Sequence, residues 1–149
     1  MHAITVTVNG QPPTVVSSGT RISDLLPSVN GDGFPVLGAI VNNMVLPLFM
    51  PLVADAALAP LTIQNPYGWD IYRTSLCFLL AKSVHELYPG IECRVRNSVG
   101  AGLYCTVQWP DLSPAALDAH VKRLKAAMLE AVRQDLAISP VTVSYEAAT

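Results

Sequence analysis

Apolar and polar residues alternate through the start of the chain with the two-residue period that is typical of half-buried β-strands. Ile4, Val6 and Val8 alternate with threonines and an asparagine. Asn9-Gly10 follows, and this pair favours the positive backbone angles of a tight hairpin turn. The β-branched residues 14–16 then predict the returning strand. The pattern therefore predicts a β-hairpin at the beginning of the chain.

Further short elements are predicted up to residue 64. Residues 22–26 indicate a short helix, capped by Thr20 or Ser23 and ended by Pro27. Apolar runs predict strands over residues 35–41, 44–48 and 61–63, and Asn42-Asn43 favours a turn between the first two. Two strands, a short helix and further strands are the order of a β-grasp (ubiquitin-like) fold. We therefore expect residues 1–64 to form such a unit.

The pattern becomes helical after Asn65-Pro66-Tyr67-Gly68, which we interpret as a linker at a domain boundary. A broad apolar stripe then predicts a helix that is mostly buried and that ends at Pro89-Gly90. The residues of this stripe are Leu76, Leu80, Val84 and Leu87. Alternating residues predict two strands after it, over residues 91–96 and 103–109.

The most regular pattern belongs to a last helix. Ser113 is a favourable N-cap, and Pro114 suits the first helical position. The core stripe of this helix is predicted at Leu117, Val121, Leu124 and Met128. Ser139-Pro140 should break the helix, before a closing strand over residues 141–145. Residues 66–149 thus form a second α+β region, and the fold class expected for the whole chain is α+β.

Composition narrows the possible functions. Hydrophobic residues make up 51% of the 149 residues and charged residues 13%, which excludes intrinsic disorder. The net charge of −2 and the absence of a basic run argue against strong non-specific binding of nucleic acid. The chain begins without a signal-peptide pattern, and its most apolar stretch, Val45–Leu58, is too short to span a bilayer. We expect a cytoplasmic protein with no membrane partner.

Cysteines and histidines lack the spacing of metal or disulfide sites. The three cysteines, at positions 77, 93 and 105, form no C-x-x-C pair and are odd in number, so reduced and buried thiols are expected. The three histidines, at positions 2, 85 and 120, have no neighbour at ligand spacing. The chain also lacks a P-loop and a G-x-S-x-G motif. We therefore expect no metal and no cofactor.

One group of residues suggests a ligand site. Arg94 and Arg96 share a face of the strand predicted over residues 91–96, and a glycine-containing loop follows it. Cations, an amide, a hydroxyl and an aromatic ring together could hold a phosphate or a nucleotide. The full set of predicted ligand-binding residues is Arg73, Arg94, Arg96, Asn97, Ser98 and Tyr104. The alternative is a solvated sheet face on which Glu92 pairs with a cation.

Several runs of residues make a family resemblance specific. Residues 1–64 resemble a TGS domain, the β-grasp module of threonyl-tRNA synthetases and some GTPases. The opening hairpin carries this likeness together with the runs at 22–26 (ISDLL) and 39–43 (AIVNN). Residues 66–149 resemble the first part of the synthetase editing domain. The runs at 71–80 and 97–105 are similar to those of uridine kinase-like nucleoside kinases that carry a TGS region.

Departures from the synthetase pattern bear on activity. The editing site of the family has an H-x-x-x-H motif, and the matching positions here are Thr74 and Phe78. Neither side chain can serve as a base near neutral pH. The later part of the editing domain, which supplies a cysteine, has no counterpart in this sequence. The resemblance therefore implies a chain without catalytic residues.

Two functions remain open at this point. The resemblance to the kinases implies a non-catalytic regulatory or ligand-binding region of a nucleoside kinase, followed in the parent protein by a P-loop domain or acting as a homodimer. In that view the chain stops where the kinase linker would start. The alternative is a stand-alone module that binds tRNA, another RNA or a protein and is related to threonyl-tRNA synthetase without editing activity.

Overall fold

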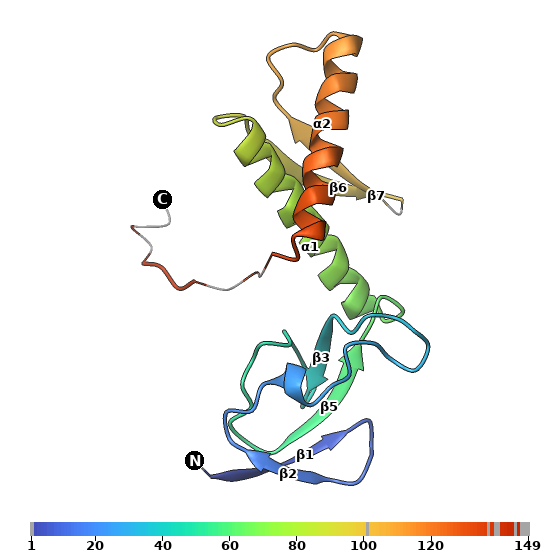
Figure 1. Ribbon diagram of the computed structural model, residues 1–149, viewed down its shortest axis with the longest axis vertical. Coiled ribbons are helices and arrows are strands. Elements are labelled where there is room, and N and C mark those ends of the chain that lie inside the picture. Colours follow the sequence, from blue (N-terminus) through green and yellow to red (C-terminus); the bar gives the residue numbers. More distant parts are fainter. Residues whose placement is uncertain (1, 101, 137, 139–140, 145, 147–149) are drawn as a thin grey trace. The chain divides into compact units, whose positions relative to one another are not determined.

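The computed structural model describes residues 2–100, 102–136, 138, 141–144 and 146 (Figure 1). The chain forms two compact units, residues 1–76 and 77–149. Both units contain strands and helical segments, so the predicted α+β class is confirmed. None of the helices in the described ranges is long and apolar enough to cross a membrane.

A five-stranded sheet organises the first unit. Its strands are β1 (Ala3–Val8), β2 (Thr14–Ser17), β3 (Gly38–Val41), β4 (Met44–Leu46) and β5 (Ala56–Leu61). The spatial order is β2-β1-β5-β3-β4, with β1 and β5 parallel and the other neighbours antiparallel. The first and last strands thus meet in the middle of the sheet. This arrangement confirms the expected β-grasp unit.

The two predicted turns have the backbone angles that their sequences favour. Asn9 and Gly10 have φ values of 48° and 69°, and Asn42 and Asn43 have 47° and 70°. Asparagine tolerates this left-handed region better than most residues. Asn42 also links the β3–β4 turn to the segment around β5, because its Nδ2 donates to the Asp55 carbonyl at 3.0 Å and its Oδ1 accepts from the Ala57 N–H at 2.9 Å.

The core cluster of this unit includes Val6 and Ile22, each 2% exposed or less. Leu61 of β5 is 1% exposed as well but does not belong to this cluster. Ile22 belongs to a single 3₁₀ turn, Ile22–Asp24. The short helix expected over residues 22–26 is present only as this single turn, and its expected cap is wrong, because Arg21 occupies the N-cap position and makes no side-chain cap bond. The Thr20 hydroxyl instead donates to the Ser17 carbonyl at 2.8 Å.

Helix α1 (Pro66–Leu87) begins earlier than expected. Residues 65–68, interpreted from sequence as a linker, form its cap and first turn: the Asn65 side chain accepts from the Tyr67 N–H at 2.9 Å and its carbonyl from the Trp69 N–H at 2.8 Å. A proline at the first helical position needs no N–H partner, which is why the helix can start there. The division between the two compact units falls inside this helix. The domain boundary that the sequence places between residues 64 and 66 stays a prediction.

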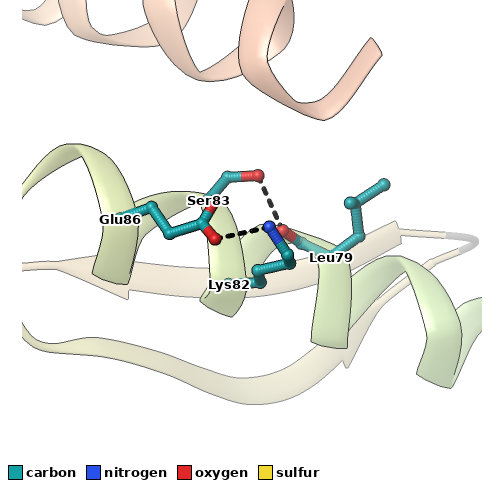
Figure 2. Close-up of polar contacts among 4 residues, drawn as sticks. All are labelled: Leu79, Lys82, Ser83 and Glu86. Carbon is teal, nitrogen blue, oxygen red and sulfur yellow. Dashed lines mark hydrogen bonds and ion pairs between the residues drawn. The ribbon is translucent and has the colours of Figure 1, made fainter. Parts of the chain in front are cut away.

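The expectation that α1 is mostly buried is wrong. Leu76 is 39% exposed and Phe78 is 55% exposed, whereas Val84 is fully buried and Ser83 is 2% exposed. Figure 2 shows how the polar residues of this stretch are satisfied within the helix: the Ser83 hydroxyl donates to the Leu79 carbonyl at 2.8 Å, and Lys82 pairs with Glu86 at 2.6 Å. Its apolar residues are spread around the helix rather than confined to one stripe, so the helix cannot bury all of them on one side.

The second unit contains the end of α1, a β-hairpin and a second helix. The hairpin consists of β6 (Cys93–Val99) and β7 (Gly102–Val107), which are antiparallel, and α2 spans Pro114–Arg133. Ser113 caps α2 as predicted, since its hydroxyl oxygen accepts from the Ala116 N–H at 3.4 Å.

Three expectations about α2 and the residues that follow it are wrong. Val121, predicted in the core stripe of α2, is 61% exposed, while Leu124 is 7% exposed. Helix α2 ends at Arg133, because Asp135 takes a left-handed conformation with φ 46° and its N–H bonds back to the Val132 carbonyl. Residues 141–144 form no strand. Ser139, Pro140 and Tyr145, which were part of the same expectation, lie outside the described residues.

Candidate functional site

The predicted ligand-binding residues of the second unit lie on the β6–β7 hairpin, where the strand register shifts by one residue. Val95 pairs with Cys105, but Ser98 pairs with Leu103. Two residues of β6, Arg96 and Asn97, therefore stand opposite the single residue Tyr104 of β7. Such an irregularity bends a strand and redirects side chains, and it often occurs beside functional sites.

The shift also decides which side chains share a face. Cross-strand partners lie on the same face of a ladder, and faces alternate along β7. Leu103 and Cys105 are half-buried, whereas Tyr104 between them is 54% exposed. Arg94 pairs with Thr106 and so lies on the Tyr104 face, together with the Arg96-Asn97 pair. Ser98 pairs with Leu103 and lies on the other face, because the extra residue reverses the alternation.

The two arginines of this face differ in their electrostatic partners. The Nε of Arg94 donates to Oε1 of Glu92, and the Nε2 of Gln108 donates to Oε2 of Glu92 at 3.2 Å. The pairing of Glu92 with a cation, expected as the alternative for this face, is therefore confirmed. Arg96 is exposed, and in the described part of the chain it forms no ion pair. It is thus the cation of this face that is available to an anion.

Other residues that the sequence singled out lie on α1. Arg73 and Thr74 belong to the first unit, and Phe78 to the second. Whether Arg73 contributes to the same site as the hairpin residues stays a prediction. Thr74 and Phe78, which the sequence resemblance assigns to the histidine positions of the editing motif, are both exposed and lie one helical turn apart.

The three cysteines are free thiols of intermediate burial, less buried than expected. Burial raises the pKa of the Cys93 thiol, and the nearby Cys105 and Cys77 thiols raise it further. Burial and Cys77 raise the pKa of Cys105 in the same way. The Cys93 and Cys105 thiols are therefore weakly nucleophilic near neutral pH. Across the residues that the structure describes, no group of three or more His, Cys, Asp or Glu side chains could hold a metal ion.

Sequence reasoning missed an aromatic cluster in the second unit. The rings of Trp109 and His120 are stacked, with centroids 4.4 Å apart and planes 3° apart. Tyr88 contacts both rings edge-on, its hydroxyl lies 3.0 Å from Nδ1 of His120, and the guanidinium of Arg123 lies over its ring. Tyr88 directly follows α1, Trp109 lies in the segment after β7, and His120 and Arg123 belong to α2. The cluster connects the end of the first helix, the segment after the hairpin and the second helix. No regular spacing of these residues in the sequence predicts it.

Comparisons with known proteins point to one enzyme. No family model matches the chain. A threonine–tRNA ligase of Pelodictyon phaeoclathratiforme is 32% identical over 98 residues, which is 66% of this chain and 14% of that protein. Those of Desulforamulus reducens and Rubrobacter xylanophilus are 28% and 26% identical over 131 and 137 residues, or 87% and 89% of the chain.

These matches cover both compact units, but they span only 14 to 20% of the length of the three ligases. The synthetase side of the resemblance inferred from sequence is confirmed, and the kinase side stays a prediction. The chain is therefore similar to one part of threonyl-tRNA synthetases.

Proposed function

We propose that this chain is an RNA-binding module related to threonyl-tRNA synthetase, without editing activity, and that tRNA is its main ligand. The observation that carries the proposal is the extent of the similarity: 87% of the chain aligns with a threonine–tRNA ligase, so the likeness covers both compact units. This reading corresponds to the second of the two functions inferred from sequence. A cytoplasmic location is part of the proposal.

The exposed face of the β6–β7 hairpin has the chemistry that such a ligand requires. A guanidinium can hold a phosphate with two parallel hydrogen bonds, and Arg96 has no carboxylate partner among the described residues. Asn97 adds an amide beside it, and the exposed ring of Tyr104 stands opposite both. RNA offers phosphates, hydroxyls and unpaired bases to groups of this kind. We therefore propose that the binding surface lies on this face of the hairpin, and Ser98, which lies on the opposite face, is not part of it.

The charge of the chain sets the expected strength of binding. Seven of its nine Lys and Arg residues lie in the second unit, but an equal number of acidic residues lies there as well. Binding through one or two arginines releases few counter-ions, so we expect a modest affinity that falls gently with salt. This is the behaviour of a module that assists recognition rather than of a strong RNA clamp.

The test removes both arginines of the face. The double variant Arg94→Ala/Arg96→Ala should bind tRNA at least about tenfold more weakly than the unmodified chain in calorimetry at low salt, because charge-assisted phosphate contacts contribute about 1.5–3 kcal/mol each. Its unfolding temperature should stay unchanged, since exposed arginines add little to stability.

The matched control is Lys122→Ala/Arg133→Ala, which removes two exposed cations of α2 that are already paired with acids. Equal loss in both double variants would mean that only net charge matters. Full binding by the Arg94/Arg96 variant would contradict the proposed surface, and no binding of tRNA by the unmodified chain would contradict the function.

The nucleoside-kinase hypothesis stays a prediction, and it differs from the proposed function in the ligand that it predicts. A regulatory region of such a kinase would bind a uridine nucleotide in preference to tRNA. Calorimetry with UTP in parallel with tRNA separates the two functions. The relatives reported above favour the tRNA reading.

A further inference from the structure

Glu92, Arg94 and Gln108 form a small polar network at the open end of the hairpin. Both oxygens of the Glu92 carboxylate are engaged, Oε1 by the Arg94 guanidinium and Oε2 by the Gln108 amide at 3.2 Å. The backbone holds the two strand ends together as well, because the Gln108 N–H donates to the Glu92 carbonyl at 3.2 Å. The geometry of the carboxylate therefore belongs to the hairpin itself.

This carboxylate holds Arg94 in the way a phosphate would. Its oxygens accept from a guanidinium and from an amide N–H, and a phosphate oxygen accepts from the same donors. The side chains of Glu92 and Arg94 are 40% and 54% exposed, so water and ligands reach the pair. An exposed ion pair of this kind is weak, and a stronger anion can compete with it.

Arg96, two residues further along β6, is in a different state. It lies on the same exposed face, opposite Tyr104, and has no ion-pair partner in the described ranges. The face therefore carries one available cation and one that its own carboxylate occupies. A ligand that meets Arg94 must also approach the negative charge of Glu92.

We propose that Glu92 is an internal competitor for the anionic ligand of this face and limits its affinity. Arg96 makes the first phosphate contact, and Arg94 contributes only after the ligand displaces Glu92 from it. Neutralising Glu92 releases Arg94 and removes a repulsive charge, so the second phosphate contact becomes available. This inference concerns the site of the proposed function and rests on it for the identity of the ligand.

The substitution Glu92→Gln tests the idea with little change of shape. Its amide oxygen can still accept from Gln108, while the negative charge is lost. We expect tRNA to bind about three- to tenfold more tightly at low salt. The slope of log affinity against log salt should steepen by about 0.7–0.9, the value for one more neutralised phosphate.

The control is Glu86→Gln. It removes the acid of another exposed ion pair, Lys82–Glu86 on α1 (Figure 2), and changes the net charge by the same amount. If both glutamine variants strengthen binding equally, long-range charge explains the effect and the inference is wrong. Thermal unfolding of both variants checks that the fold is kept.

A double-mutant cycle tests whether the effect of Glu92 on binding acts through Arg94. Arg94→Ala should weaken binding by a factor at least about three times larger in the Glu92→Gln background than in the unmodified chain, whereas Arg96→Ala should weaken binding equally in both. An equal effect of Arg94→Ala in the two backgrounds would overturn the competition between Glu92 and the ligand.

Tripolyphosphate as a second probe separates this inference from the proposed function. Suppose that the chain does not bind tRNA, but that the Glu92→Gln variant binds tripolyphosphate more tightly than the unmodified chain does. The RNA function is then wrong and the competitor role stands. If tRNA binds and Glu92→Gln has no effect with either probe, the RNA function stands and the competitor role is wrong. If no variant binds either probe, both are wrong.

Discussion

At the scale of single residues, Gly68 has the least room for a side chain among the glycines that the structure describes. It is buried in the first turns of α1, and a Cβ added to it would lie 2.0 Å from the carbonyl oxygen of Thr62. That distance is far below any van der Waals contact, and the opposing atom is backbone, which cannot rotate away. Glycine is therefore required at this point because of the close approach between α1 and the segment after β5, and not because of its backbone angles.

We predict that Gly68→Ala destabilises the chain by about 1–3 kcal/mol or more, because overpacking against backbone forces the helix start to move. Helix propensity alone would predict the opposite, since alanine is favoured over glycine in a helix by about 1 kcal/mol. Urea unfolding followed by circular dichroism measures the change. Gly31→Ala is the matched control, because nothing lies within 4 Å of its added Cβ; a stability of Gly68→Ala equal to that of this control would contradict the prediction.

At the scale of elements, the start of α2 shows how a few polar residues define a helix boundary. Ser113 caps the helix with its hydroxyl, and its own N–H donates to Oδ1 of Asp111 at 2.8 Å. These hydrogen bonds satisfy N–H groups that have no partner within the helix. The hydrogen bond from the Ser113 backbone lowers the pKa of the Asp111 carboxyl, the Ser113 side chain lowers it further, and the charge of His120 adds a smaller effect.

The lowered pKa of Asp111 predicts a pH dependence of stability. Because its carboxyl holds its proton less firmly in the folded chain, the stabilisation is fully present above about pH 4, the usual pKa of an aspartate, and is lost as the pH falls through the lower folded value. Asp111→Asn lacks this titration. The unfolding temperature of the variant should lie below that of the unmodified chain at pH 6–7, and the difference should shrink toward pH 3. A difference that stays constant over this range would exclude the charge of Asp111 as its cause.

At the scale of the whole molecule, the chain combines a β-grasp unit with a smaller unit in which two helical segments accompany a hairpin (Figure 1). Its similarity to threonyl-tRNA synthetases covers both units. The resemblance inferred from sequence assigns the histidine positions of the editing motif to Thr74 and Phe78. The Ser75 hydroxyl, a neighbouring nucleophile, donates to the Ile71 carbonyl at 2.9 Å. On this assignment, neither position of the editing motif carries a histidine.

We therefore predict that the chain binds tRNA but does not hydrolyse tRNA charged with serine. Incubation with Ser-tRNA should release serine at the rate seen with heat-denatured chain, because neither threonine nor phenylalanine can act as a base at neutral pH. Faster release that disappears in Ser75→Ala or Cys77→Ala would contradict this prediction. Binding of the same tRNA, measured in parallel, ensures that a lack of hydrolysis does not reflect a lack of contact.

Local signals in the sequence were sufficient for two turns and for the start of α2. The Asn9-Gly10 and Asn42-Asn43 turns and the Ser113 cap were predicted correctly, because backbone angles and capping bonds are decided within a few positions. The β-grasp order and the α+β class followed from these local elements. The cationic face of the hairpin was also predictable, since alternation along a strand places Arg94 and Arg96 together.

Only the tertiary structure decided the remaining features, because they depend on residues that are distant in sequence. Strand β5 (Ala56–Leu61) is rich in alanine and contains a proline, so it has little intrinsic strand preference, and it is a strand because β1 and β3 pair with it on both sides. The one-residue register shift that separates Ser98 from Asn97 arises between β6 and β7 and leaves no mark in either strand alone. The partners of Glu92 and the stacking of Trp109 on His120 are likewise products of folding, since contacts of this kind exist only once the strands and helices have met.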